Sequence, residues 1–182
     1  MKTITVKDMM VELAEYAIVP EEATLGEAIL ALEKAQKEFD PSRHRHRAIL
    51  VLDRNKKVVG KISMLDVLRG LEPKYGKIKV NGVLSRAGFS SEFLKSMFNE
   101  YALWAEPFID ICSKAAELKV RHFMYTPSEG EYVDEDATLG QAMHQLVMGH
   151  HHSLLVTRKD EIVGILRLSD VFAKICDEIK SC

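Results

Sequence analysis

The sequence predicts a mixed α/β protein in which one structural unit is used twice. The segment Val19–Ala28 returns as Val133–Ala142, 114 residues later. A second segment, Val58–Leu68, returns as Ile162–Phe172, 104 residues later and in the same order. Two copies with the same internal order predict two related units that pack face to face and form paired clefts. The smaller second offset places an insertion in the first copy, around residues 37–47.

Each copy begins with a short strand and a helix. Thr24 and Glu27 have the spacing of a capping box, and Thr138 and Gln141 repeat it. In such a box the Thr hydroxyl accepts from a first-turn amide, and the acidic or amide side chain reaches back to the cap amide. The helix after Thr24 carries apolar residues at helical spacing, which favours burial of one face against a sheet. These residues are Leu25, Ala28, Ile29 and Leu32.

A hairpin and a second helix follow in each copy. Short apolar runs flank a polar turn, at 48–52 and 58–62 in the first copy and at 154–156 and 162–166 in the second. This pattern is typical of two hydrogen-bonded strands. Further helices are predicted to begin near Ser63 and near Leu168. The order strand, helix, hairpin, helix therefore predicts an α/β sandwich in each copy.

A segment unlike either copy separates them, which divides the sequence into residues 1–71, 72–117 and 118–182. Apolar residues follow helical spacing in the central part, at Leu94, Met97, Phe98, Tyr101, Ala105 and Phe108. We expect a helical connector that Pro107 divides into two helices, because proline removes an amide donor and crowds the preceding turn. The connector either covers the open side of the core or offers a docking surface to a second subunit or another protein.

Composition excludes several classes of function. Lys and Arg number 25 and Asp and Glu number 27, and the net charge of −2 argues against a general nucleic-acid binder. No apolar run approaches the ~20 residues of a membrane span, so no membrane partner is expected. The three cysteines show no C-x-x-C spacing, which indicates free thiols and a cytoplasmic location. Motifs of hydrolases, metalloproteases and phosphate-binding loops are missing, so we expect no enzyme.

The ordered motifs resemble the cystathionine β-synthase (CBS) domain. The pattern is Val-Pro-x-x-Ala-Thr-Leu-x-x-Ala, then an apolar hairpin, then Gly-x-h-[Ser/Thr]-x-x-Asp with h apolar. The resemblance covers roughly residues 1–71 and 118–180. It implies two pseudo-symmetric β-α-β-β-α units packed together, a homodimer, and regulatory binding of AMP, ADP, ATP or S-adenosylmethionine. The central segment is longer than the linker typical of that family.

The first copy keeps the Ser and Asp of the last motif as Ser63 and Asp66. A carboxylate at a helix start can accept two hydrogen bonds from a ribose diol, and Ser63 with the first-turn amides can hold a phosphate. The alternative is structural: Ser63 caps the helix and Asp66 complements its dipole. The resemblance implies the ribose role for Asp66.

The second copy departs from this pattern. Asp170 matches Asp66, but Arg167 replaces the Ser or Thr. Arg167 could clamp a phosphate through bidentate hydrogen bonds, fill the cleft and leave it empty, or be a plain surface residue. We therefore expect the first cleft to bind an adenosine ligand better than the second.

Basic and histidine residues precede both hairpins. His46 and Arg47 lie in the first copy, and His150 and His152 lie in the second, where His150 matches His46 at the 104-residue offset. These groups could neutralise phosphates, hold a metal ion, or form a solvated loop. Side chains alternate along a strand, so His150 and His152 could share one face.

The resemblance also implies an adenine slot just before the first helix of each copy. The residues in that place are Ile18, Val19, Tyr132 and Val133. Tyr132 could stack on a base or be a packed aromatic residue.

The sequence thus predicts a cytoplasmic regulatory module that senses an adenosine nucleotide, with no catalytic cofactor. Its ligand would shift the population of two arrangements and so signal to an unidentified regulated protein. The alternatives are a ligand-free dimerising scaffold and a histidine-based metal sensor.

Overall fold

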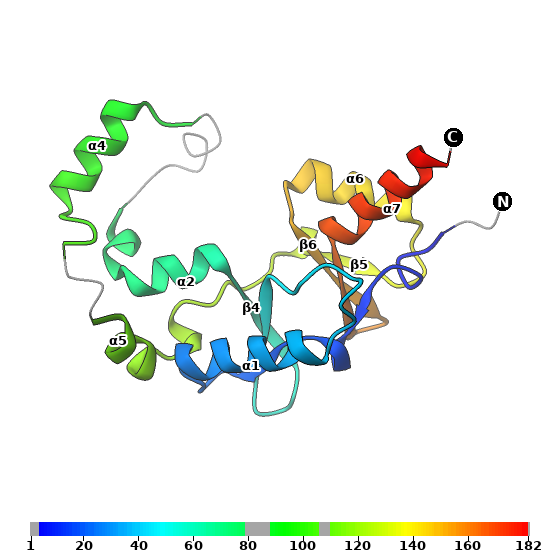
Figure 1. Ribbon diagram of the computed structural model, residues 1–182, viewed down its shortest axis with the longest axis horizontal. Helices are drawn as coiled ribbons and strands as arrows, with labels where there is room; N and C mark the ends of the chain where they lie inside the picture. Colours follow the sequence, from blue (N-terminus) through cyan, green and yellow to red (C-terminus); the bar gives the residue numbers. More distant parts are fainter. Residues whose placement is uncertain (1–3, 79–87, 106–109, 182) are drawn as a thin grey trace.

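A computed structural model describes residues 4–78, 88–105 and 110–181 (Figure 1). The first unit contains β2 (Ile18–Pro20), α1 (Leu25–Glu38), β3 (Ala48–Leu52), β4 (Val58–Ser63) and α2 (Met64–Leu71). The second unit contains β5 (Tyr132–Asp134), α6 (Leu139–Gly149), β6 (Ser153–Arg158), β7 (Glu161–Arg167) and α7 (Leu168–Lys180). This order confirms the predicted α/β fold of two β-α-β-β-α units.

The two units share one sheet topology. In the first sheet β2 pairs parallel with β3, and β3 pairs antiparallel with β4. In the second sheet β5 pairs parallel with β6, and β6 pairs antiparallel with β7. Val51 lies opposite Gly60 in one hairpin, and Val156 lies opposite Gly164 in the other. The sequence repeat is therefore a structural repeat down to strand register.

Each unit is completed by the segment that precedes the other unit in sequence. Strand β1 (Val11–Glu12) pairs antiparallel with β7, so the N-terminal segment extends the second sheet, and η1 (Leu13–Glu15) leads back to the first unit. In return, η4 (Val120–His122) and its flanking residues attach to the first unit, where the Leu25 amide donates to the Leu118 carbonyl at 2.8 Å. This exchange ties the two units together.

A hydrophobic core fills the space between the two units. Leu50 of β3 faces away from the first unit's own core, because side chains alternate along a strand, and the same holds for Leu155 of β6. The cluster between the units consists of Val11, Tyr16, Phe39, Leu50, Leu155 and Ile165. Both faces of these strands are buried, which explains their nearly continuous apolar sequence.

The capping boxes lie where the sequence predicts them. The hydroxyls of Thr24 and Thr138 accept from the amides of Glu27 and Gln141, both at 3.2 Å. On α1, Leu25 and Ala28 are buried as expected. The expected burial of Ile29 is wrong, because its side chain is 41% exposed. Each helical residue turns about 100°, so Ile29 lies at the edge of the apolar stripe.

The central segment is helical where it is described. It contains η2 (Pro73–Lys77), α4 (Ser91–Glu100) and α5 (Ile111–Glu117). The predicted continuation of the helix toward Phe108 is wrong, because α4 ends at Glu100 and two residues after it, Ala102 and Trp104, have positive φ angles of 46° and 53°. Pro107 and Phe108, to which the predicted division referred, lie outside the described residues.

Of the two roles considered for the connector, α5 agrees with a cover over the core and α4 does not. Helix α5 packs against α1 and contacts α2. Helix α4 stands away from both sheets, at the left of Figure 1. Its Phe93, Leu94 and Phe98 side chains are 45–52% exposed.

Candidate ligand-binding sites

The first candidate site is built at the N-terminus of α2. The Ser63 hydroxyl accepts from the Asp66 amide at 3.3 Å, and Asp66 Oδ2 accepts from the Ser63 amide at 2.8 Å and from its hydroxyl at 2.6 Å. Asp66 is buried, with 7% of its surface exposed. Its other oxygen, Oδ1, has a long contact of 3.5 Å to Arg69, whose side chain is 65% exposed. The structural capping role is thus present, and Oδ1 retains capacity to accept from a ligand.

A buried ion pair joins the two units close to this site. Lys61 of β4 pairs with Glu131, the last residue of η5 (Glu129–Glu131), which is 2% exposed. The Tyr125 hydroxyl donates to the same carboxylate at 2.5 Å, and the Ser128 amide donates at 3.1 Å. Burial acts to raise the pKa of Glu131, but the hydrogen bonds from Lys61, Tyr125 and Ser128 together lower it. Glu131 is therefore charged and paired across the boundary between the units.

Sequence reasoning did not single out Lys61 or Glu131. At the repeat offsets of 104 and 114 residues, their equivalents are the apolar Ile165 and Ala17. The available signal for these two residues was that each is charged where the other copy has an apolar residue. Nothing in the sequence indicates that Lys61 and Glu131 meet.

At the second candidate site the Arg167 side chain pairs with the Asp170 carboxylate. Its Nε and Nη2 donate to the two oxygens of Asp170 at 2.5 and 2.7 Å, and its Nη1 donates to the His44 carbonyl at 2.8 Å. Arg167 is 5% exposed, so the surface alternative is wrong. The guanidinium fills the place beside Asp170 and reaches the loop that precedes β3. A phosphate contact by Arg167 stays a prediction.

His46 packs into the same cluster. Its ring lies between Tyr16 and Phe39, with centroid distances of 4.5 and 4.2 Å, and it is 5% exposed. Its Nδ1 is 3.2 Å from Arg167 Nη1, so it serves as an acceptor, while its buried Nε2 has no hydrogen bond of ordinary geometry among the described residues. Burial and the Arg167 charge lower the pKa of His46, opposed by the Glu15 carbonyl.

His46 is expected to make folding depend on pH just below neutrality. Because its pKa is lowered in the folded state, the unfolded chain binds the proton more tightly, and the free energy of unfolding falls as the pH falls below 6.5. The contribution is complete above that value. Urea unfolding between about pH 7.5 and 5.5 should show a steeper loss in wild type than in His46→Gln. Parallel profiles would contradict this expectation. The lowered pKa of Glu131 acts below 4.5, outside this window.

The other predicted basic residues do not join these clusters. Arg47 is exposed at the start of the hairpin. His150 ends α6 in the left-handed conformation, with a φ of 52°, and it is exposed, unlike its repeat partner His46. His152 is exposed, and its carbonyl accepts from the Leu168 amide at 3.0 Å. Within residues 4–78, 88–105 and 110–181, no three His, Cys, Asp or Glu residues are grouped to hold a metal ion.

The four residues of the implied adenine slot divide into two pairs. Val19 and Val133 are buried in the cores of their own units. Ile18 and Tyr132 are half-buried against the cluster between the units. The packing of Tyr132 agrees with the packed-aromatic alternative, and an adenine contact at Ile18 or Tyr132 stays a prediction.

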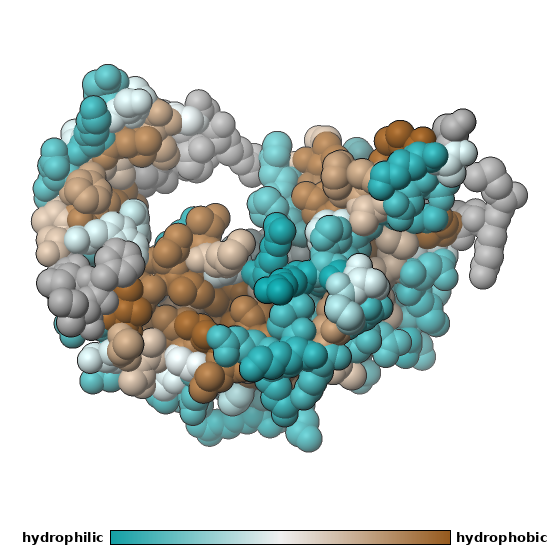
Figure 2. Space-filling view, viewed as in Figure 1, coloured by the Kyte–Doolittle hydropathy of each residue, from teal (hydrophilic) through white to brown (hydrophobic). Residues whose placement is uncertain are grey.

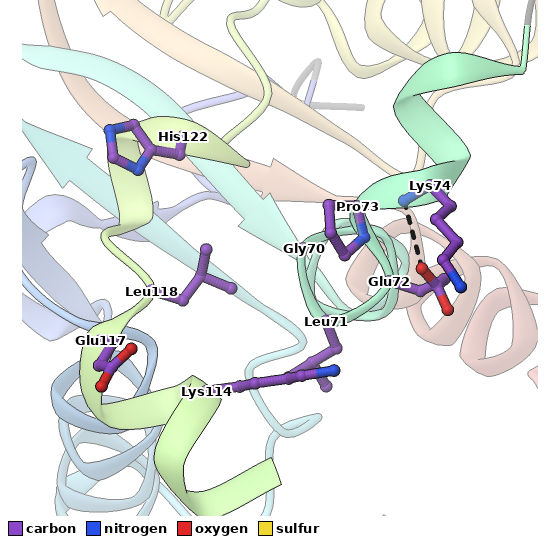
Figure 3. A pocket seen from close by; sticks show the side chains of 9 residues that line it. All are labelled: Gly70, Leu71, Glu72, Pro73, Lys74, Lys114, Glu117, Leu118 and His122. Carbon is purple, nitrogen blue, oxygen red and sulfur yellow. Dashed lines mark hydrogen bonds between the residues drawn. The ribbon is translucent and has the colours of Figure 1, made fainter. Parts of the chain in front are cut away.

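A separate pocket of about 350 Å³ lies at the other end of α2. Figure 3 shows α2 and η2 on one side and α5 with η4 on the other. Two lysines, Lys74 and Lys114, are balanced there by Glu72 and Glu117. Lys74 Nζ already donates to the Ala102 carbonyl at 2.8 Å. No residue singled out from the sequence as a ligand contact lines this pocket.

The family model for the CBS domain matches residues 6–73 and 120–177. The chain belongs to the CBS domain family. It holds two CBS domains, as the repeat predicts. One candidate site lies at the last helix of each domain, at the start of α2 or of α7. A comparison with curated proteins gave no match. No helix in the described part of the chain is long and apolar enough to cross a membrane.

Solved CBS structures share the fold. A CBS domain-containing protein from Bacillus anthracis is 19% identical with a TM-score of 0.59, over 96% of this chain and 94% of that one. CBSX2, solved in complex with AMP, is 21% identical with a TM-score of 0.59, over 96% and 97% of the two chains. The CBS domain of the bacterial CNNM/CorC family Mg²⁺ transporter, solved with ATP, is 15% identical with a TM-score of 0.57, over 95% and 87%.

Proposed function

We propose that this CBS pair is a regulatory module that binds an adenosine nucleotide at the first candidate site. The observation that carries the proposal is Asp66, which is buried at the N-terminus of α2 with Oδ1 unused by the capping box. That oxygen can accept from a ribose hydroxyl, and the first-turn amides of α2 favour a phosphate. The complexes of CBSX2 with AMP and of the CNNM/CorC transporter with ATP support AMP, ADP or ATP, and S-adenosylmethionine shares their adenosine.

By the same reasoning, each chain would bind one nucleotide, because the second candidate site is filled. At the second candidate site both oxygens of Asp170 accept from Arg167, so a ribose would have to displace a buried guanidinium. Displacement would also remove the hydrogen bond of Arg167 to the His44 carbonyl. Breaking a buried ion pair without replacing its charge is costly.

The signal would pass through the contact between the units. Asp66 is close enough to Tyr125 to raise the pKa of its hydroxyl, after the larger effects of Glu131 and burial. A ligand at Asp66 therefore lies beside the Lys61–Glu131 pair that joins the units. The ligand can shift the balance between two relative arrangements of the units only by the difference between its affinities for them. An unidentified cytoplasmic protein would read the result, and the module itself needs no catalysis.

Asp66→Ala is expected to weaken nucleotide binding about 10–100-fold, because each ribose hydrogen bond lost at a buried site costs on the order of 1–3 kcal/mol. Calorimetric titration with AMP, ADP, ATP and S-adenosylmethionine measures this effect. Asp170→Asn is the matched control in the other unit and should leave the affinity unchanged. Thermal unfolding of both variants separates lost binding from lost folding. If no ligand binds the wild-type chain, the scaffold alternative is preferred.

A further inference from the structure

The pocket at the C-terminal end of α2 is formed largely by the connector. Five of its nine lining residues belong to the segment 72–117. Asp66 and the proposed nucleotide site lie in the first turn of α2, and this helix of 8 residues separates them from the pocket. The pocket is therefore a second cavity, and a ligand bound there does not require a nucleotide at Asp66.

The two sides of the pocket meet where α2 packs against the segment around η4. At Gly70 an added Cβ would lie 2.8 Å from Phe123 Cγ and 3.1 Å from Leu118 Cδ2, so the glycine permits this close approach. Leu71, Pro73 and Leu118 give the pocket an apolar lining, and Figure 2 shows hydrophobic surface over α2 and toward α5. A preformed apolar pocket with a few polar groups is typical of small-molecule sites.

Two opposite charges line this pocket without pairing with each other. Glu72 is 7% exposed, and its carboxylate accepts from the Trp104 amide at 2.7 Å and from the Lys74 amide at 3.2 Å, both neutral donors. Lys74 Nζ donates to the neutral Ala102 carbonyl at 2.8 Å. Among the residues that the structure describes, neither Glu72 nor Lys74 forms an ion pair. Buried charges in proteins are ordinarily paired, because removal from water is costly without an opposite charge.

We propose that this pocket binds a small zwitterion of the α-amino acid type. The ammonium group of the ligand pairs with Glu72 and its carboxylate pairs with Lys74, so one molecule supplies the missing partner of each charge. Each carboxylate oxygen can accept a second hydrogen bond and an ammonium group has three donors, so both side chains keep their present bonds. The volume of about 350 Å³ is small for a ligand pocket, and Leu71 and Leu118 favour an aliphatic side chain.

The ligand also strengthens the attachment of α4 to the first unit. Glu72 and Lys74 hold the turn after α4 through Trp104 and Ala102. The Trp104 indole adds a hydrogen bond to the Tyr75 hydroxyl at 3.1 Å. Helix α4 stands away from both sheets (Figure 1), so its position depends on these contacts. A ligand that restricts the Glu72 and Lys74 side chains therefore restricts α4.

Titration of the full chain with L-leucine, without nucleotide, tests this proposal separately from the proposed nucleotide site. Trp104 is the single tryptophan of the sequence, and its amide donates to Glu72, so its fluorescence should change as leucine binds. We expect a dissociation constant of about 1 mM or tighter. Two analogues with the same aliphatic chain serve as probes of charge. 4-Methylpentanoate lacks the ammonium group and 3-methylbutylamine lacks the carboxylate, so each should bind more weakly by about tenfold or more.

Calorimetric titration of two variants locates the leucine site. Glu72→Gln and Lys74→Met each remove one charge and should weaken leucine binding by about tenfold or more. Lys77→Met is the matched control, because Lys77 is exposed on the same η2 segment and does not line the pocket, and it should leave the affinity unchanged. Thermal unfolding confirms that the three variants fold. The proposal is overturned if leucine does not bind, if either analogue binds as tightly as leucine, or if Glu72→Gln or Lys74→Met keeps the wild-type affinity.

Discussion

If the first candidate site binds a nucleotide as proposed, Arg167→Ser is expected to open the second candidate site and to raise the stoichiometry from the proposed one nucleotide per chain to two. The change frees both oxygens of Asp170 and restores the Gly-x-h-Ser-x-x-Asp pattern of the first unit. In the wild-type chain Arg167 occupies the cap position of α7 and makes no side-chain cap, whereas Ser63 caps α2. A serine at this position can accept from the Asp170 amide.

The same substitution should lower the free energy of unfolding. Removing one member of a buried pair costs about 3–5 kcal/mol, of which a restored cap returns about 1 kcal/mol. His46 Nδ1 and the His44 carbonyl also lose their donor. The variant is therefore expected to melt at a lower temperature without ligand and to recover part of the difference when nucleotide is added, because ligand binding stabilises the folded state.

Calorimetric titration of wild type, Arg167→Ser and Arg167→Met distinguishes the possible roles of Arg167. The methionine control removes the charge but supplies no hydroxyl, so it should lose stability without gaining full affinity at the second site. If Arg167→Ser is folded and still binds one nucleotide, Arg167 does not close the site. If wild type binds two nucleotides and the variant binds one, Arg167 is a phosphate ligand.

The local features of the fold were predictable because they depend on neighbouring residues. The capping pairs Thr24–Glu27 and Thr138–Gln141 mark the starts of α1 and α6, since both partners of each box lie within one turn. The hairpins follow from apolar runs around polar turns. The end of α4 was not predictable, because Ala102 and Trp104 adopt positive φ angles that these residue types do not favour.

The candidate sites depend on contacts between residues far apart in the sequence. Arg167 reaches His44 across 123 residues, and Lys61 meets Glu131 across 70. Sequence reasoning could name Arg167 and Asp170 as neighbours on one helix start, but their burial results from the loop of the other unit. The exchange of β1 into the second sheet has the same origin, since two residues of strand carry no signal of their partner.

Gly164→Ala is expected to lower the free energy of unfolding more than Gly60→Ala does. The two glycines lie at equivalent places in the hairpins of the two units. A Cβ at Gly164 would lie 2.5 Å from the backbone oxygen of Val11 in β1. At Gly60 the nearest atom would be Met124 Sδ, at 2.6 Å, and a methionine side chain can move aside. The backbone of β1 cannot move without breaking its pairing with β7.

Overpacking of this kind costs about 1–3 kcal/mol, and we expect Gly164→Ala at or above the upper end and Gly60→Ala at the lower end. The entropic gain of replacing glycine by alanine is common to both variants and cancels in the comparison. With about 2–4 °C for each kcal/mol in a chain of this size, the melting temperatures should differ by several degrees. Hydrogen exchange adds a local measurement, because Gly164→Ala should remove protection from Val11, which is fully buried in wild type. Equal melting temperatures with Val11 still protected would mean that β1 shifts to accommodate the added methyl group while it stays paired with β7, and they would contradict the prediction.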